Sequence, residues 1–349
     1  MSTETQSSSS SAQLSEKQSG SAEAALDVLR VRYKLAPSSF KNLTSVKSAP
    51  SRQDVLRQAC FCAEFAAFPF TSSDKPFFRE INDHCPIPYR IMENLTHPWH
   101  KVFLLVQIDL AYCGWPHKLS SAARKELHSE RGRIYRILDQ VLRCLADILG
   151  QRMDGTGVNA AVDVLRSVKA GLWEGNDTEL LQIEGIGPAK VQKLAQAGIK
   201  TIRQLAKLEF YHIERLLSRN PPFGQRLLHQ LAGFPLLELT VQRANVLTSK
   251  EPVGATYIDS IQPHSVVLRV LLRYTNDEIP LWRKKHPWTT LVMTDNGGRL
   301  VWFWRGSVKR LTEGKDMFVR VQVESGQTLQ AVFACEEIVG TMQRQVVNI

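Results

Sequence analysis

Motifs that mark a nucleotide-driven motor or a hydrolase are absent from the sequence. There is no Gly-x-x-x-x-Gly-Lys-Ser/Thr loop to cradle phosphates, and the segment Asp277–Pro280 reads Asp-Glu-Ile-Pro rather than Asp-Glu-x-His. Neither a Gly-x-Ser-x-Gly nor a His-Glu-x-x-His segment occurs. We therefore expect no catalytic residue, no cofactor and no ATP hydrolysis in this chain. ATP and Mg²⁺ would enter only with a motor domain lying upstream.

The six cysteines include no Cys-x-x-Cys pair. Cys60 and Cys62 flank a single residue, which does not suit the usual zinc knuckle, and the segment His97–His100 is more typical of a helix start because it contains proline and tryptophan. There is also no secretory signal and no apolar run long enough to span a bilayer. We expect reduced, buried thiols, no metal site and no membrane contact.

Negative charge is in deficit. The 349 residues carry 44 Lys and Arg against 34 Asp and Glu, a net charge of +10. Between Glu184 and Arg226, eight basic residues stand against three glutamates, so this stretch alone carries +5. The balance favours an anionic partner, with nucleic acid ahead of an acidic membrane surface.

The most specific pattern lies at Gly185-Ile186-Gly187-Pro188. Glycines permit a tight turn, and a proline is suited to the first turn of a helix. The pattern predicts a helix, a hairpin and a second helix whose first N–H groups are free to bind an anion. Lys190 lies in the first turn, and on a nucleic acid the anion would be a backbone phosphate. The residues that we expect at this contact are Gly185, Ile186, Gly187, Lys190 and Lys193.

The hairpin pattern has two other interpretations. A helix-turn-helix that only packs is possible, but apolar residues at helical spacing on both sides favour the phosphate site. A base-excision glycosylase needs a catalytic aspartate shortly after such a hairpin, and no aspartate occurs between Thr178 and Ile258. The later segment Asn220–Gly224, which reads Asn-Pro-Pro-Phe-Gly, is either a second, imperfect hairpin or a plain connector between helices.

The expected fold is multidomain, with α structure followed by β structure. Helical spacing dominates the first two thirds, and a period of two begins at Leu236. The predicted parts are a disordered serine-rich tail with a short helix (1–50), a helical bundle with order beginning at Ser51 (51–176), a helix-hairpin-helix domain (177–235) and an immunoglobulin-like or fibronectin type III-like β-sandwich of about seven strands (236–349).

The long helix predicted for residues 129–151 has an apolar face and a polar stripe. The stripe, whose members are spaced three and four residues apart, contains Arg133, Arg136, Gln140, Arg143 and Asp147. Such a stripe is usually solvated, but three arginines shortly before a phosphate-binding hairpin equally favour contact with a nucleic-acid strand. Gly155 and Gly157 are expected to break the chain before a helix over residues 158–171.

Aromatic and basic residues of the β part have two interpretations each. Trp302 and Trp304 lie on one face of a predicted strand, where a core or interdomain contact is favoured over base stacking. The segment Trp282–His286 is a basic loop of the kind that solvent usually surrounds.

The order of these parts resembles a known unit. The segments that carry the resemblance are AGLWEG (170–175), LLQIEGIGPAKVQKL (180–194) and LLSRNPPFGQRLLHQLAGFP (216–235). They are similar to the C-terminal SEC sixty-three homology unit of superfamily 2 helicases, and most of all to the meiotic crossover (MER-three) type. The similarity extends over roughly residues 51–349.

The resemblance implies roles for particular residues. In the family, the long helix lies along the unwound strand, so Arg133 and Arg136 are the expected strand contacts, with Arg143 on the same stripe. The family's hairpin contacts backbone phosphate, and Gly185, Gly187 and Lys190 match it. Related archaeal enzymes carry a base-stacking tryptophan midway along the helix, where this chain has Gln140.

The resemblance also implies a function with a gap. Helicases of this family fuse the unit to two motor domains and a winged helix, which this sequence does not contain. Either the gene model is cut or the chain is a paralogue without a motor. We expect a nuclear module that holds single-stranded or branched DNA, with RNA as another possible substrate, and that works beside recombination proteins. The alternative is a protein-interaction scaffold without direct DNA contact.

Overall fold

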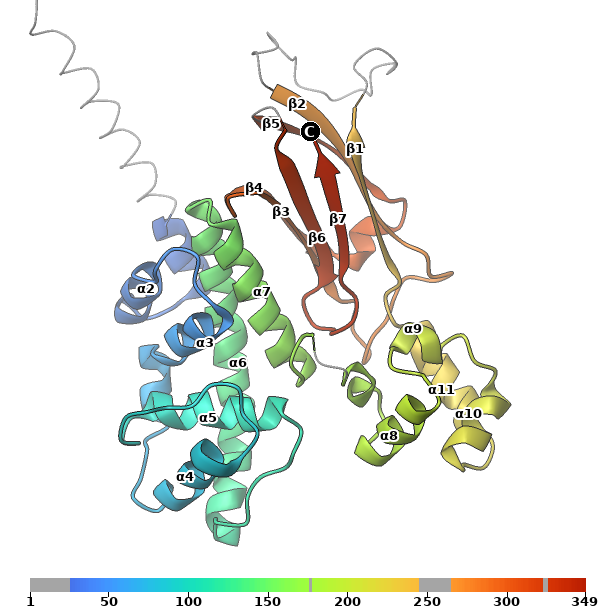
Figure 1. The fold of residues 1–349 in the computed structure, drawn as a ribbon. Coiled ribbons are helices and arrows are strands. Elements are labelled where there is room, and N and C mark those ends of the chain that lie inside the picture. Colours follow the sequence, from blue (N-terminus) through green and yellow to red (C-terminus); the bar gives the residue numbers. More distant parts are fainter. Residues whose placement is uncertain (1–25, 176–177, 245–264, 323–325) are drawn as a thin grey trace, which may run out of the picture. The chain divides into compact units, whose positions relative to one another are not determined.

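The structure is a computed structural model that describes residues 26–175, 178–244, 265–322 and 326–349. Helices come first and antiparallel strands follow, as the sequence predicts (Figure 1). The chain forms two compact units. Residues up to Gln107 together with Trp115–Ala161 make the first unit, and Ile108–Gly114 together with Val162–Ile349 make the second. The predicted serine-rich tail lies outside the described residues up to residue 25.

The first unit is helical. Its helices bury apolar faces against one another, and α3 begins with a capping box in which Ser51 and Asp54 exchange hydrogen bonds. The elements are α2 (Pro37–Thr44), α3 (Arg52–Cys60), the 3₁₀ turn η1 (Ala63–Ala67), α4 (Lys75–His84), α5 (Pro98–Leu110) and α6 (Ser121–Gln151), followed by the start of α7 (Gly155–Ala170).

Order begins well before Ser51, so that part of the prediction is wrong. Residues 26–33 are helical, and Leu29 and Tyr33, four residues apart, are both buried. Phe40 and Leu43 of α2 are buried too, and the Gln58 side chain donates a 2.6 Å hydrogen bond to the Asn42 carbonyl. The short helix predicted within residues 1–50 thus belongs to a packed segment, because its apolar side chains recur at helical spacing.

The long helix α6 starts eight residues earlier than predicted. The Ser120 side chain accepts a 3.2 Å hydrogen bond from the Ala123 N–H and so caps the helix. The end at Gln151 is as predicted. Gly155 and Gly157 do not break the chain but open α7, because the Asp154 side chain accepts from the Gly157 N–H at 2.8 Å.

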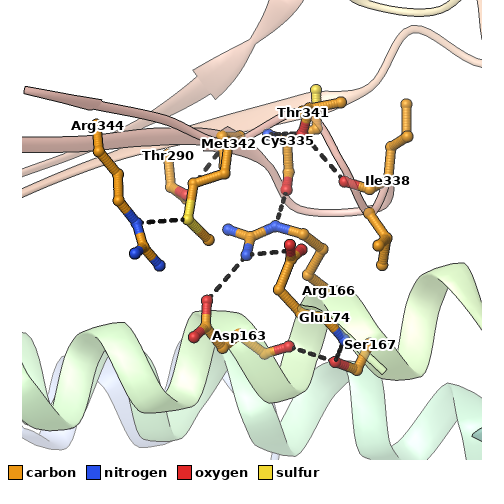
Figure 2. Close-up of polar contacts among 12 residues, drawn as sticks. Asp163, Arg166, Ser167, Glu174, Thr290, Cys335, Ile338, Thr341, Met342 and Arg344 are labelled. Atoms are coloured by element: carbon orange, nitrogen blue, oxygen red, sulfur yellow. Dashed lines mark hydrogen bonds and ion pairs between the residues drawn. The ribbon is translucent and has the colours of Figure 1, made fainter. Parts of the chain in front are cut away.

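In the second unit, the later part of α7 is joined to the end of strand β6 by a buried arginine (Figure 2). The Nε of Arg166 donates to the Cys335 carbonyl at 2.6 Å, and its Nη1 donates to Asp163 at 2.9 Å and to Glu174 at 3.2 Å. Burial alone would lower the pKa of Arg166, but the two carboxylates outweigh it and raise the pKa above its ordinary value. The guanidinium therefore stays charged and holds the helix on the strand.

Short helices follow. They are η2 (Glu179–Gln182), α8 (Pro188–Gln196), α9 (Ile202–Leu205), α10 (Phe210–Leu217) and α11 (Phe223–Ala232). The helix expected before the hairpin is only the 3₁₀ turn η2. The side chains of η2 form hydrogen bonds with other segments. Glu179 accepts from the Ile202 N–H at 2.6 Å, and Gln182 donates to the Val339 carbonyl at 2.8 Å.

Seven antiparallel strands in the described residues make two sheets. One sheet has the order β1-β2-β5, with β1 (Leu237–Arg243), β2 (Ser265–Tyr274) and β5 (Lys315–Gln322). The other has the order β4-β3-β6-β7, with β3 (Trp288–Asp295), β4 (Leu300–Ser307), β6 (Thr328–Cys335) and β7 (Gln343–Asn348). Gln345 of β7 both donates to and accepts from the backbone of Val241 at 2.8 Å, which links the two sheets at one edge.

One buried apolar cluster contains residues of both sheets and of the hairpin segment. It includes Leu268 and Val270 of β2, Leu291 of β3 and, beside the hairpin, Ile183 and Ile186. The hairpin is therefore positioned by the same core that holds the strands together. Of the two tryptophans on β4, Trp304 packs against this cluster, whereas Trp302 is 38% exposed.

Candidate nucleic-acid interface

The hairpin owes its shape to two glycines and a buried isoleucine. Gly185 has φ +82°, a conformation that favours glycine, and the Ile186 N–H closes the turn on the Ile183 carbonyl at 3.1 Å. The Ile186 side chain is 3% exposed, so this residue anchors the hairpin and does not face solvent. Gly187 is the residue before α8, with Pro188 in its first turn.

The start of α8 is not capped by any side chain. The N–H groups of Lys190 and Val191 already donate to the Gly187 carbonyl, at 2.9 Å and 3.0 Å. Among the described residues, no acceptor takes the N–H groups of Gly187 or Ala189. The predicted bare donors are thus fewer than a full helix start offers, but they lie at the positive end of the helix dipole.

Two cations lie on the Phe223 ring beside the hairpin. The Lys190 Nζ is 4.7 Å from the centre of this ring and donates a hydrogen bond to the Gly185 carbonyl. The Arg219 guanidinium lies 5.4 Å from the same ring centre. Burial and the neighbouring Arg219 lower the pKa of Lys190. Lys193 is exposed and has its Nζ 3.5 Å from the Ser218 hydroxyl. We call Gly185, Gly187, Lys190, Lys193 and Arg219 the hairpin surface.

Arg219 is a member of this surface that sequence reasoning missed. It directly precedes the Asn-Pro-Pro-Phe-Gly segment, and its tie to the hairpin runs through Phe223. The sequence contains both Arg219 and Phe223, but only the folded chain shows that Phe223 lies beside Gly185. A Cβ added at Gly185 would lie 3.9 Å from the Phe223 ring.

The Asn-Pro-Pro-Phe-Gly segment does not form a second anion site. It leads into α11, where the Gly224 N–H donates to the Glu214 carboxylate at 2.8 Å. Glu214 is 6% exposed, and the Phe223 N–H donates to the Asn220 carbonyl at 3.2 Å. The protein's own groups occupy these donors, so of the two interpretations left open, the structure favours the connector.

The arginine stripe of α6, in the first unit, is open only in its earlier half. Arg133 and Arg136 are exposed, and the Arg133 guanidinium lies 5.1 Å from the centre of the Phe68 ring. Arg143 is half-buried with its Nε 3.1 Å from the Asp139 carboxylate. These positions leave Arg133 and Arg136 as the accessible cations of the stripe.

The later half of the stripe is covered by the N-terminal helix of residues 26–33, which the sequence placed in a tail. The Gln140 side chain donates to the Tyr33 carbonyl, and Asp147 accepts from the Tyr33 hydroxyl at 2.6 Å. The interpretation of one continuous solvent-facing stripe is therefore wrong. Gln140 therefore holds the chain's own backbone.

Four of the six free cysteines are buried, namely Cys60, Cys62, Cys144 and Cys335. Burial raises the pKa of Cys62 and of Cys144 to about 12, so both stay protonated thiols at neutral pH. Cys113 is exposed, which the sequence did not predict. Within the described ranges, no helix combines the length and the apolar character needed to cross a bilayer.

Comparison with known proteins adds a family and several relatives. The family model described as the Sec63 Brl domain matches residues 29–348. The ATP-dependent DNA helicase MER3 of Saccharomyces cerevisiae is 22% identical over 325 residues, which cover 88% of this chain and 26% of that helicase. The probable ATP-dependent DNA helicase HFM1 of Xenopus tropicalis is 21% identical over 219 residues, which cover 62% of this chain and 16% of that protein. The HFM1 of Homo sapiens is 24% identical over 216 residues, which cover 60% of this chain and 14% of that protein. The chain spans about a quarter of the length of MER3 and less of HFM1.

Proposed function

Because this chain belongs to the Sec63 Brl domain family, we propose that it is the nucleic-acid-holding accessory part of a DNA helicase of the MER3 and HFM1 kind. It binds single-stranded or branched DNA through backbone phosphates and leaves ATP hydrolysis to other parts of such a helicase. In this proposal the protein acts in the nucleus, in meiotic recombination, together with recombination proteins.

The observation that carries this proposal is the uncapped start of α8 next to a group of cations. A phosphate at the Gly187 and Ala189 N–H groups would meet the positive end of the helix dipole. Lys193 and Arg219 would add charge from the same surface. Contacts of this kind hold a strand without reading its sequence.

We propose that the second unit combines a helix-hairpin-helix element with a fibronectin type III-like sandwich. The first helix of that element is reduced to the single turn η2. In the constant-type immunoglobulin sandwich, the fourth strand joins the first sheet. Here β4 pairs with β3 in the second sheet, which favours the fibronectin type III-like alternative.

Arg133 and Arg136 of α6 are proposed as a second contact with the strand. Both are exposed, they are three residues apart, and they therefore lie on one face of the helix. Arg143 contributes less in this proposal, since its guanidinium is engaged with Asp139.

A salt titration of single-stranded DNA binding tests the proposal. Each phosphate neutralised contributes about 0.7 to the slope of log affinity against log salt for a single strand. Replacing Gly185 and Gly187 together by valine should lower affinity uniformly across sequences. Lys193→Gln together with Arg219→Gln should lower the magnitude of the salt slope by about 1.4. Binding that all these variants retain, with an unchanged slope, would show that the hairpin is structural only.

A protein-interaction scaffold is the second candidate. It is favoured by exposed apolar side chains on the sandwich, where Phe318 is 53% and Val346 is 63% exposed. A scaffold without DNA contact would show no salt-dependent retention of single-stranded DNA, so the same titration separates the two candidates.

A further inference from the structure

A pocket of about 570 Å³ lies next to the hairpin in the second unit. Its walls are residues 181–187, Tyr112 and Arg283. Arg283 is the one cation among these lining residues and Glu184 is the one carboxylate, while the Tyr112 side chain is 44% exposed. The volume is within the range of about 300–1,000 Å³ that is typical of small-ligand sites.

Arg283 is held at the pocket by a tight two-residue turn. The backbones of Trp282 and Lys285 exchange hydrogen bonds of 2.9 Å, and Arg283 and Lys284 between them have φ +48° and +63°. Such turns favour Asn-Gly, because most side chains resist positive φ at both positions. Trp282 is buried and its ring centre lies 5.5 Å from that of Phe234, so the turn is fixed to the core.

The Arg283 guanidinium is positioned but not saturated. Its Nη2 donates to the Gln182 carbonyl at 2.8 Å, and Gln182 is itself held by two side-chain hydrogen bonds to the Val339 backbone. A guanidinium has five N–H donors. In the described part of the chain, no acceptor takes the remaining donors of Arg283, which line the pocket.

We propose that this pocket holds one nucleotide of a strand that lies on the hairpin. Arg283 binds the phosphate of that nucleotide, because a guanidinium can present two parallel N–H groups to phosphate oxygens. The ring of Tyr112 stacks on the base. Lys284 and Lys285, which are both exposed, extend the positive charge along the strand. This inference rests on the proposed function and adds a contact from the β part of the chain.

The test measures binding of a fluorescent single-stranded DNA of mixed sequence to the full chain over a range of salt. Arg283→Gln should weaken binding about 10-fold and lower the salt slope by about 0.7. The matched control is Arg320→Gln, which removes the same charge from an exposed position on β5 outside the pocket and should leave both quantities unchanged. Glu184→Gln should tighten binding 2- to 5-fold, which a misfolded variant would not do.

Stacking is tested separately. Tyr112→Ala should weaken binding by about 5-fold to 150-fold with an unchanged salt slope, whereas Tyr112→Phe should bind like the parent. Equal binding by the Arg283→Gln and Arg320→Gln variants, in a chain whose hairpin variants do lose DNA, overturns this inference and leaves the proposed function standing. No binding by the parent chain, or preference for an acidic peptide over DNA, overturns both.

Discussion

Two helices of the second unit have proline and glycine at or next to their first residues, and they differ in what accepts hydrogen bonds from their first N–H groups. At α8 no side chain caps the start, and Gly187 and Ala189 keep donors that no described group accepts. At α11 the buried Glu214 carboxylate accepts from Gly224. The two starts look alike in sequence, but a single carboxylate from a neighbouring helix decides which of them remains available to a phosphate.

Gly187 at the start of α8 and Gly224 at the start of α11 have different roles. A Cβ added at Gly224 would collide with the Phe210 carbonyl, whereas one added at Gly187 would meet no atom within 4 Å. Gly224 is thus required by packing inside the protein. Gly187 keeps space open at the surface, where a strand could approach.

The largest effect is expected for Gly224→Ala. The added methyl group must push the backbone of α10 away, so the free energy of unfolding should fall by about 2–3 kcal/mol. Urea unfolding followed by circular dichroism measures it. A loss below about 0.5 kcal/mol would mean that the two helices are not packed as closely as described.

Glu214→Ala should have the next largest effect. It leaves the buried Gly224 N–H without an acceptor, which costs about 1–3 kcal/mol in the free energy of unfolding. Glu214→Gln keeps an acceptor oxygen and should retain most of that stability. If the two variants are equally stable, the carboxylate does not cap α11.

Gly187→Ala should affect binding more than stability. The free energy of unfolding should change by less than about 1 kcal/mol, because the site is roomy and its φ of −106° suits alanine. Affinity for single-stranded DNA should fall about 5-fold, since the added methyl group would take up open space that a phosphate needs to approach the hairpin. A variant that binds DNA like the parent would remove the distinction between the two glycines.

The smallest effect concerns pH. Because the pKa of Lys190 is lowered by burial and by Arg219, this lysine loses its proton at a lower pH than an ordinary lysine with a pKa of 10.5. DNA affinity should therefore begin to fall before pH reaches 10.5, and Lys190→Arg, which stays charged, should delay the fall. Fluorescence anisotropy between pH 8 and pH 10 compares the two proteins; identical curves would exclude a contribution of the Lys190 charge.

The sequence predicts what depends on local chemistry. Turn residues and periodicity predict the hairpin at Gly185–Gly187, the end of α6 at Gln151 and the change to strands after Leu236. These features are fixed by neighbours a few residues apart.

Features that depend on distant segments could not be predicted. Tyr33 covers Gln140 across 107 residues, and Arg283 reaches Gln182 across 101 residues. Each contact changes the interpretation of a candidate binding surface. The Tyr33 contact covers half of the arginine stripe, and the Gln182 contact places a cation beside the hairpin. Neither leaves a periodic signal in the sequence.

The Gly187 and Ala189 N–H groups at the start of α8 are open to a phosphate, whereas the Gly224 N–H at the start of α11 is occupied by Glu214. The most direct measurement follows the backbone amide signals of Gly187, Ala189 and Gly224 by two-dimensional NMR while a short single-stranded DNA is added. We expect saturable shifts for Gly187 and Ala189 and none for Gly224. Unmoved Gly187 and Ala189 signals at a DNA concentration that saturates binding would contradict this expectation.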